Sequence, residues 1–275
     1  LARRLHRYSR AEVQRLIKDG RVSLRERPVK AADRVGTGDR IVVRYPRREE
    51  APPRYERLAV LHEDEWLVAV AKPGDLLSHP TDKILRGAAT SILREQFRDA
   101  KLHLAHRLDR ETSGVLLLSK DAATARALMD RFTNRRIAKE YLALARGRAG
   151  FERKLVELPL AREGGEIKVR QTVSQEGQPA ATELRRLALG RDSSLILAAP
   201  RTGRLHQIRV HLAALGHPVL GDKLYTGAGA AYMKAVRREL TDGDLAELGA
   251  ARQMLHAWTL RLEHPATGRT LTLKA

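Results

Sequence analysis

The chain has 275 residues, 43% of them hydrophobic, so it is long enough to bury a sizeable core. It carries 52 Lys and Arg against 33 Asp and Glu, a net charge of +19 that favours binding to polyanions such as nucleic acid. The absence of cysteine excludes disulfides, thiolate metal sites and thiol nucleophiles, and no apolar run reaches membrane-spanning length. We therefore expect a cytoplasmic protein, and the spacing of the histidines predicts no metal site.

The first predicted unit is small and covers residues 1–46. Ser9 is placed to begin a helix, with Glu12 completing a capping box and Gly20 ending the helix in a left-handed cap. Apolar residues recur at helical spacing on one side, at Val13, Leu16 and Ile17. Basic residues project from the other side, at Arg10, Arg15 and Lys18. RVSLRERPVK and GDRIVVRY are expected to follow as short strands.

A charged stretch with two prolines predicts a linker over residues 47–57, and residues 58–275 form the second unit. It is expected to begin with two strands in RLAVLHEDEWLVAVAKP and an amphipathic helix in GAATSILREQF. A strand buried on both faces follows in SGVLLLSK, and then a helix in DAATARALMDRF. A strand in IAKEYLALARG and a final hairpin in HAWTLRLEHPATGRTLTL complete the unit. Because strands and helices do not alternate strictly, we predict an α+β fold with a mixed, largely antiparallel sheet, preceded by a small α/β domain.

One carboxylate stands out at the start of the buried strand. Asp109 lies in HRLDRET, directly before that apolar run. The flanking Arg107 and Arg110 would favour its ionised form by proximity. Such an anion suits nucleophilic attack or stabilisation of a developing cation better than it suits general-acid chemistry. From the residues alone, a loop cap or a surface ion pair is the more common alternative.

A second polar cluster occupies residues 201–225, RTGRLHQIRVHLAALGHPVLGDKLY. A helix over LHQIRVHLAAL would have an inner apolar stripe made of Leu205, Ile208, Leu212 and Leu215. A polar face of the same helix would hold Arg204, Gln207 and His211. Arginine forks bind carboxylate or phosphate in a bidentate manner, although a solvated basic face is the simpler interpretation. GHPVLGDKLY is expected to form a loop with a structural role.

Together these segments resemble the RluA family of pseudouridine synthases. HRLDRETSGVLLLSK, KEYLALARG and the whole of residues 201–225 carry the resemblance, which extends from about residue 58 to the end. KPGDLLSHP, GQPAATEL and MLHAWTLRLEHPATG give weaker support. The resemblance implies an isomerase that breaks the glycosidic bond of uridine in RNA, turns the uracil and rejoins it through carbon 5, without a cofactor.

The resemblance also implies roles for particular residues. Asp109 matches the essential catalytic aspartate, and Arg209 matches an arginine that pairs with it and helps to hold the flipped nucleotide. Tyr141 matches a tyrosine that stacks on the uracil and is proposed to remove the proton from its carbon 5. Arg107 matches a further active-site arginine near the RNA. Contacts with RNA are also expected in the second motif, from Arg204, His206 and Gln207.

The first unit resembles the S-four-type RNA-binding module, which often precedes a catalytic domain of this family. The resemblance implies that its basic residues contact RNA, namely Arg10, Arg15, Lys18 and Arg21. Two departures are visible: RERP replaces a common Asn-Gly turn after the first strand, and KPGD replaces the KPxG turn of the catalytic domain. The second departure leaves the roles of Lys72 and His79 open.

We therefore expect an RNA pseudouridine synthase that acts on large-subunit ribosomal RNA, with tRNA as the alternative substrate. RNA is the expected partner, and a monomer without an obligate protein partner or membrane attachment is predicted. A non-catalytic RNA-binding or ribosome-assembly protein on the same fold is the main rival. A glycosidase or nuclease would need a second carboxylate or a metal cluster, for which Glu111 is the nearest candidate in sequence.

Overall fold

The computed structural model describes residues 10–24, 26–44, 53–81, 84 and 86–275. The chain divides into two compact units, residues 1–51 and 52–275. Ser9 and the side chains of Arg10 and Glu12 lie outside the described residues, and so does the predicted capping box that depends on them. In the described part of the chain, no helix is long and apolar enough to cross a membrane.

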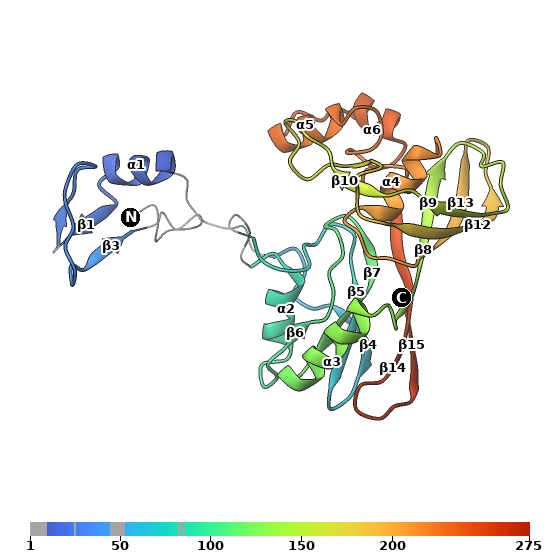
Figure 1. Ribbon diagram of the computed structural model, residues 1–275, viewed down its shortest axis with the longest axis horizontal. Coiled ribbons are helices and arrows are strands. Elements are labelled where there is room, and N and C mark those ends of the chain that lie inside the picture. Colours follow the sequence, from blue (N-terminus) through green and yellow to red (C-terminus); the bar gives the residue numbers. More distant parts are fainter. Residues whose placement is uncertain (1–9, 25, 45–52, 82–83, 85) are drawn as a thin grey trace. The chain divides into compact units, whose positions relative to one another are not determined.

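The first unit packs one helix against a small antiparallel sheet (Figure 1). The helix α1 spans Arg10–Lys18, and the strands β1 (Val22–Leu24), β2 (Arg27–Pro28) and β3 (Ile41–Val43) follow in the order β2-β1-β3. Val13 and Val22 are buried, and Gly20 ends the helix region with a φ of 66°, as predicted. RVSLRERPVK is a hairpin rather than one strand, because Leu24 pairs with Arg27 and Glu26 adopts a φ of 69°.

The second unit is built on one ten-stranded sheet whose main order is β4-β5-β7-β14-β8-β13-β12-β9. Two further strands join it, since β6 (His103–Leu104) pairs with β7 and β15 (Thr270–Lys274) pairs with β14. The main strands are β4 (Ala59–Glu63), β5 (Leu67–Lys72), β7 (Ser113–Ser119), β8 (Ala138–Arg146), β9 (Arg153–Glu157), β12 (Ala181–Leu189), β13 (Ser193–Pro200) and β14 (Leu255–Glu263).

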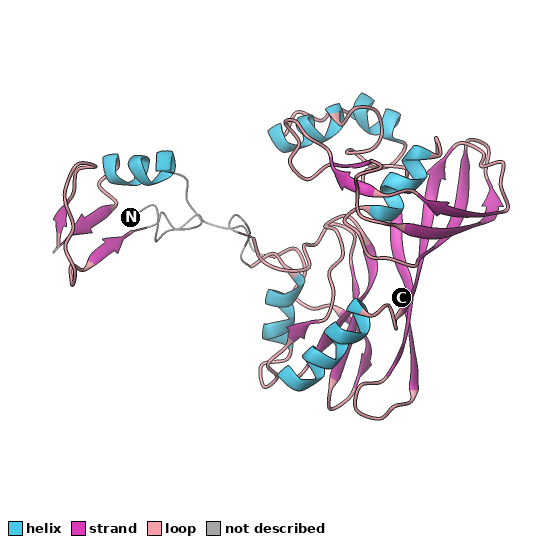
Figure 2. Cartoon of the chain, in the orientation of Figure 1, coloured by secondary structure: helices cyan, strands magenta, loops and turns pink. Residues whose placement is uncertain are grey.

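The pairing in this sheet is antiparallel except between β7 and β14, which run parallel. The predicted α+β fold with a mixed, largely antiparallel sheet is therefore confirmed. Figure 2 shows the helices gathered over parts of this sheet rather than alternating with its strands.

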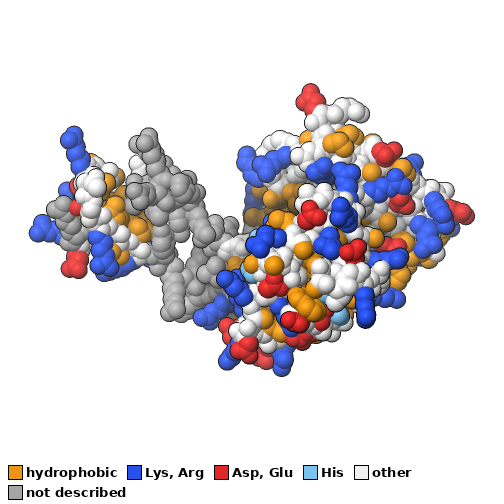
Figure 3. Space-filling model, turned by 60° about the horizontal axis from the view of Figure 1, so that its bottom comes forward, with side chains coloured by type: hydrophobic (Ala, Val, Ile, Leu, Met, Phe, Trp, Pro, Cys, Tyr) orange, Lys and Arg blue, Asp and Glu red, His pale blue; other side chains and the backbone are white. Residues whose placement is uncertain are grey.

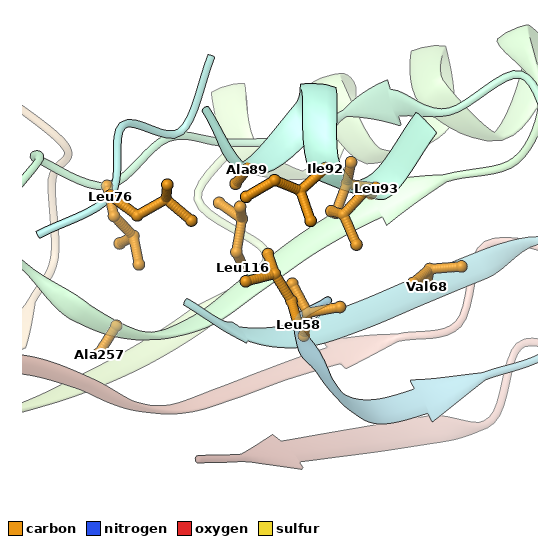
Figure 4. Packing of buried hydrophobic residues seen from close by; sticks show 11 residues of the cluster. Leu58, Val68, Leu76, Ala89, Ile92, Leu93, Leu116 and Ala257 are labelled. Carbon is orange, nitrogen blue, oxygen red and sulfur yellow. The ribbon is translucent and has the colours of Figure 1, made fainter. Parts of the chain in front are cut away.

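The helix α2 (Ala89–Gln96) packs on the half of the sheet that contains β5 and β7. Its buried residues Ile92 and Leu93 point toward Val68 of β5 and Leu116 of β7 (Figure 4). Gln96 also fastens this helix to the strand region, because its amide both donates to and accepts from the backbone of residue 58, at 3.0 and 2.9 Å.

The strand β7 is covered on both faces, as its unbroken apolar run predicts. Leu116 and Leu118 pack on the α2 side, whereas Val115 and Leu117 pack in a second core with the helix α3 (Ala122–Thr133). Asp121 caps α3 by accepting hydrogen bonds from two backbone N–H groups of its first turn. A strand buried on both sides gives the loop in front of it a rigid anchor.

The other half of the sheet carries the helices α4 (Gln207–Ala214), α5 (Ala230–Arg237) and α6 (Asp242–Leu248), together with the β10–β11 hairpin (Leu160–Arg162 and Gln171–Val173). Figure 1 shows α4, α5 and α6 grouped on the side of β9, β12 and β13. Leu212 of α4 packs there against Ile196 of β13 and Leu184 of β12. The sequence patterns did not predict β9 to β13, α5 or α6.

The two halves meet where β14 contacts both β7 and β8. Ala257 of β14 lies opposite Gly114 of β7 and opposite Tyr141 of β8. Gly114 has a φ of 114°, and a Cβ atom there would overlap the backbone carbonyl of Ala257, so this close junction requires glycine. The junction brings the loop before β7 alongside Tyr141.

Candidate active site

The loop that carries Asp109 is held at several points by buried side chains from other elements. The Ser78 hydroxyl donates to the carbonyl of Leu108 at 2.7 Å and accepts from its N–H at 3.0 Å. The Gln253 amide donates to the Thr112 hydroxyl at 2.5 Å. The loop also closes on itself through the N–H of Thr112 and the carbonyl of Asp109, at 3.1 Å. The backbone on both sides of Asp109 is therefore fixed.

Lys72, whose role the sequence left open, also contacts the backbone of this loop. Its side chain is 1% exposed, and its Nζ donates to the carbonyls of Pro73, Leu76 and Arg110 at 2.7, 2.7 and 3.1 Å. Burial lowers its pKa to about 7, although the nearby Asp109 acts in the opposite direction. The structure therefore assigns Lys72 a positioning role. His79, the other open residue, is half-buried.

Asp109 forms an ion pair with Arg209, as the resemblance implies. The Nη1 of Arg209 donates to Oδ2 of Asp109 at 2.7 Å. The remaining nitrogens of the guanidinium bind Asp222, with Nε to Oδ2 at 2.7 Å and Nη2 to Oδ1 at 2.9 Å. The side chain of Asp222 is 0% exposed and that of Asp109 is 29% exposed, so only Asp109 is open to solvent in this group.

Arg209 is the main group that keeps Asp109 ionised. Burial alone would raise the pKa of Asp109, but the Arg209 guanidinium, together with His206 and a hydrogen bond from Gln253, outweighs burial and holds the pKa below its ordinary value. Arg107 and Arg110 are exposed on the loop, and the largest effects that lower this pKa come from Arg209, His206 and Gln253 rather than from these two sequence neighbours. The carboxylate is ionised at neutral pH.

Tyr141 stands at the junction between the two halves of the sheet and packs against the cores of both. Burial raises its pKa to about 12, and the negative charge of Asp109 adds to the effect. Tyr141 is therefore a neutral phenol at neutral pH, with a ring that lies near the catalytic candidate Asp109.

The start of α4 differs from the prediction. The helix begins at Gln207, because His206 adopts a left-handed conformation with a φ of 56°. Leu205 therefore lies outside the helix with 45% of its surface exposed, and its predicted place in the inner stripe is wrong. Ile208 and Leu212 of the predicted stripe are buried.

The polar face predicted for α4 is not solvated. Gln207 and His211 are buried, and both bond to the hydroxyl of Thr182 at 2.9 Å. The side-chain oxygen of Gln207 accepts from the hydroxyl of Thr202 and from the N–H of Arg204. Its side-chain nitrogen also donates to a backbone carbonyl. Gln207 therefore supports the scaffold, and its hydrogen-bonding groups are all engaged within the protein.

Other predicted RNA-binding residues are accessible. Arg107, Arg15 and Lys18 are exposed, and Arg204 and Arg21 are half-buried. Figure 3 shows Lys and Arg side chains spread over the described surface of both units, with Asp and Glu between them. The side chain of Arg10 is not among the described ones.

The carboxylate proposed for a rival chemistry is engaged in structure. Glu111 accepts from Lys223 Nζ at 2.8 Å and from the N–H of Gln253 at 3.0 Å. Among the described residues there is no cluster of three His, Asp or Glu side chains that could hold a metal ion. A hollow of about 500 Å³ lies over β9, β12 and β13 and does not include Asp109, Tyr141 or Arg209.

Comparisons with known proteins identify the family of this chain. Residues 66–214 match the family model of RNA pseudouridylate synthase, and residues 1–41 match the model of the S4 domain. Proteins called "Ribosomal large subunit pseudouridine synthase C" are similar over most of the chain. The one from Pasteurella multocida is 33% identical over 96% of this chain and 81% of its own length, and the one from Vibrio cholerae is 33% identical over 100% and 87%.

Solved structures give the same result for the catalytic unit. Human RNA Pseudouridylate Synthase Domain Containing 1 has a TM-score of 0.64 and 28% identity, covering 82% of this chain and 86% of that one. Human RNA Pseudouridylate Synthase Domain Containing 4 has a TM-score of 0.60 and 31% identity, covering 79% and 87%. Fold and site thus define an RNA-modifying isomerase with an attached S4 domain. The chain belongs to the RNA pseudouridylate synthase family.

Proposed function

We propose that this pseudouridine synthase acts on large-subunit ribosomal RNA and uses Asp109 as its catalytic carboxylate. The substrate is supported by the names of the relatives, which match over nearly the whole chain, including the part that carries the S4 domain. The net charge of +19 fits a polyanionic partner of that size. Transfer RNA is the alternative substrate.

The observation that carries the catalytic assignment is the ionised, partly open carboxylate of Asp109. Breaking the bond between the sugar and uracil builds positive charge on the sugar, which an adjacent anion stabilises or attacks. Arg209 keeps that anion charged and oriented, and Asp222 in turn fixes Arg209 by binding two of its nitrogens. The resting enzyme therefore already holds the anion that the reaction needs.

Three routes are open to this anion. Asp109 could attack the sugar at carbon 1, add to carbon 6 of the uracil, or abstract the proton at carbon 2 of the sugar. Each of the three starts from the unprotonated carboxylate, which the lowered pKa of Asp109 supplies.

Tyr141 contributes its ring first. A neutral phenol near Asp109 can stack on the freed uracil, at about 1–3 kcal/mol per base, and so keep the base from leaving before it turns. Because burial raises the pKa of Tyr141 to about 12, removal of the carbon 5 proton by its oxygen requires the phenol to give up its own proton first. Stacking is therefore the role that its charge state favours.

The target uridine must leave its helix before it reaches Asp109, at a cost of a few kcal/mol. Arg107 is exposed on the same loop as Asp109, so we assign it a contact with the RNA around the flipped nucleotide. Arg204 is half-buried at the start of the second motif and is assigned a contact with the RNA backbone. In the S4 domain, Arg15, Lys18 and Arg21, together with Arg10, are assigned to phosphates.

Tritium release from carbon-5-labelled uridine in RNA tests the catalytic assignment. Asp109→Asn should abolish release, because the neutral amide keeps the shape and loses the charge. Asp192→Asn is the matched control, since its carboxylate is 89% exposed on the turn between β12 and β13. Normal release by Asp109→Asn would remove the assignment.

The substrate is tested separately by offering large-subunit ribosomal RNA and tRNA to the same enzyme. Faster release from the ribosomal RNA is expected, and the opposite preference would overturn this part of the proposal. Deletion of residues 1–46 should weaken RNA binding or site choice more than it slows release from a short substrate. Equal affinity and selectivity after the deletion would contradict the role assigned to the S4 domain.

A further inference from the structure

The hydroxyl of Tyr225 joins the β10–β11 hairpin to the site. Its oxygen accepts the N–H of Gln171 at 3.0 Å and lies 2.8 Å from Nδ1 of His206. The Tyr225 ring is 7% exposed, and the Arg209 guanidinium lies over it at 5.0 Å from the ring centre. Tyr225 is therefore fixed next to His206 and Arg209, which both face Asp109.

The direction of these hydrogen bonds follows from counting protons. The phenol oxygen has one proton to donate, and the N–H of Gln171 already occupies one of its acceptor positions. Among the described residues, the only recorded acceptor for the proton of Tyr225 is Nδ1 of His206. Because a buried donor without a partner is costly, the hydroxyl donates to Nδ1. A neutral His206 then carries its proton on Nε2.

That proton faces the catalytic candidate. The Nε2 of His206 lies 3.8 Å from Oδ2 of Asp109, the same oxygen that Arg209 binds at 2.7 Å. A distance of 3.8 Å is too long for a hydrogen bond, but contacts of this kind often shorten when substrate binds. Burial and the adjacent Arg209 lower the pKa of His206 to about 4, against the opposing effect of Asp109 and Asp222, so the ring is neutral at pH 7.

We propose that His206 is a positioning residue whose Nε2–H closes onto Oδ2 of Asp109 in the RNA-bound enzyme, and that Tyr225 fixes the tautomer this requires. With two donors on Oδ2 and a Gln253 hydrogen bond also on this carboxylate, its orientation toward the nucleotide is fixed. The inference rests on the catalytic assignment of Asp109 and goes beyond it, since it names the groups that orient the carboxylate.

The tautomer is measured on the free protein. Nitrogen-15 NMR of labelled imidazoles, assigned with a His206→Asn sample, should show His206 with a bare Nδ1 and a protonated Nε2 at pH 7. The Tyr225→Phe variant should show a mixture of tautomers, because Nδ1 loses its donor. A protonated Nδ1 in the unmodified protein would overturn the inference without touching the proposed function.

Two isosteric variants then test the role in turnover. The amide nitrogen of glutamine can replace Nε2, whereas that of asparagine replaces Nδ1 only. His206→Asn should lower kcat by about 10- to 100-fold, the value of one hydrogen bond to a charged group, with KM nearly unchanged. His206→Gln should restore most of that loss. Asparagine suits the left-handed backbone at this position better than glutamine does, so backbone strain predicts the reverse order.

The outcomes separate the two proposals. Equal loss in both His206 variants, or no loss in either, would overturn the positioning role while Asp109 remains the catalytic candidate. Normal turnover by Asp109→Asn would instead remove the proposed function itself. Thermal unfolding of each variant checks that the fold is intact, and the NMR result stands even if one variant fails to fold.

Discussion

Two segments meet at Arg209 and are held in opposite ways. The loop around Asp109 is fixed through its backbone, by Ser78, Lys72 and other side chains that belong to distant elements, and its own carboxylate stays 29% exposed. The turn that carries Asp222 is fixed by that carboxylate itself, which is fully buried and also accepts from two backbone N–H groups.

The difference shows how one guanidinium can serve two carboxylates with separate purposes. Asp222 uses its charge to hold Arg209 and the turn, so its contribution is to stability. Asp109 needs little from its own side chain to stay in place, so its charge is available to a substrate. Variants that separate stability from turnover can therefore test this division.

The largest effect is expected from Asp222→Asn. Removing its charge leaves Arg209 buried with one partner, which should lower the free energy of unfolding by roughly 3–5 kcal/mol and also abolish most turnover. Asp109→Asn should lower the free energy of unfolding by less than about 1 kcal/mol, because Arg209 keeps Asp222. Urea denaturation of both variants makes the comparison, and equal losses would refute the division of roles.

A pH-dependent effect is expected at Lys72. Its pKa of about 7 in the folded protein lies below the ordinary value of 10.5, so the unfolded chain binds more protons between these pH values. Stability relative to Lys72→Met should therefore rise with pH, by on the order of 3 kcal/mol between pH 7 and pH 10. Urea denaturation of both proteins at several pH values measures the difference, and a difference independent of pH would contradict the buried, depressed lysine.

A smaller effect is expected from Gln207→Leu. The substitution leaves several buried partners of the amide unpaired, so the free energy of unfolding should fall by roughly 2–3 kcal/mol. Because the amide is engaged inside the protein, RNA affinity at a temperature well below the unfolding transition should not change. A filter-binding measurement that shows weaker RNA binding with unchanged stability would instead restore Gln207 to the RNA interface.

The smallest effect is expected from Ser78→Ala. It removes the hydroxyl that contacts both backbone groups of Leu108, and the free energy of unfolding should fall by about 1–2 kcal/mol. Turnover should fall more than stability suggests, because the lost contacts sit one residue from Asp109. Tritium release at saturating RNA measures the effect, and unchanged turnover would show that Lys72 and Gln253 alone fix the loop.

The sequence predicted the parts of the fold that have strong local patterns. The run SGVLLLSK gave β7, and amphipathic spacing gave α2 and α3. The strands β9 and β12 went unpredicted because charged residues interrupt their apolar positions, as in Arg153–Glu157, whose outer face is solvated. Helix α4 was predicted two residues too early because its left-handed start at His206 leaves no mark on the apolar spacing.

The sequence could predict a site residue whose role follows from its residue type. It could not predict one whose role depends on how deeply its side chain is buried. Asp109 and Arg209 lie 100 residues apart, and only the resemblance joined them. Asp222 sits in GHPVLGDKLY, which suggested a structural loop, and nothing in those letters indicates that its carboxylate is fully buried beside an arginine.

The strand β14 also has a consequence for the order of assembly. It pairs with both β7 and β8 and so completes the sheet at Tyr141. Both strands precede it by more than a hundred residues, as the pair Gly114 and Ala257 illustrates. Pairings of such long range form slowly. During synthesis the sheet around Tyr141 therefore stays incomplete until β14 emerges from the ribosome. A nascent chain that stops before β14 is accordingly expected not to modify RNA.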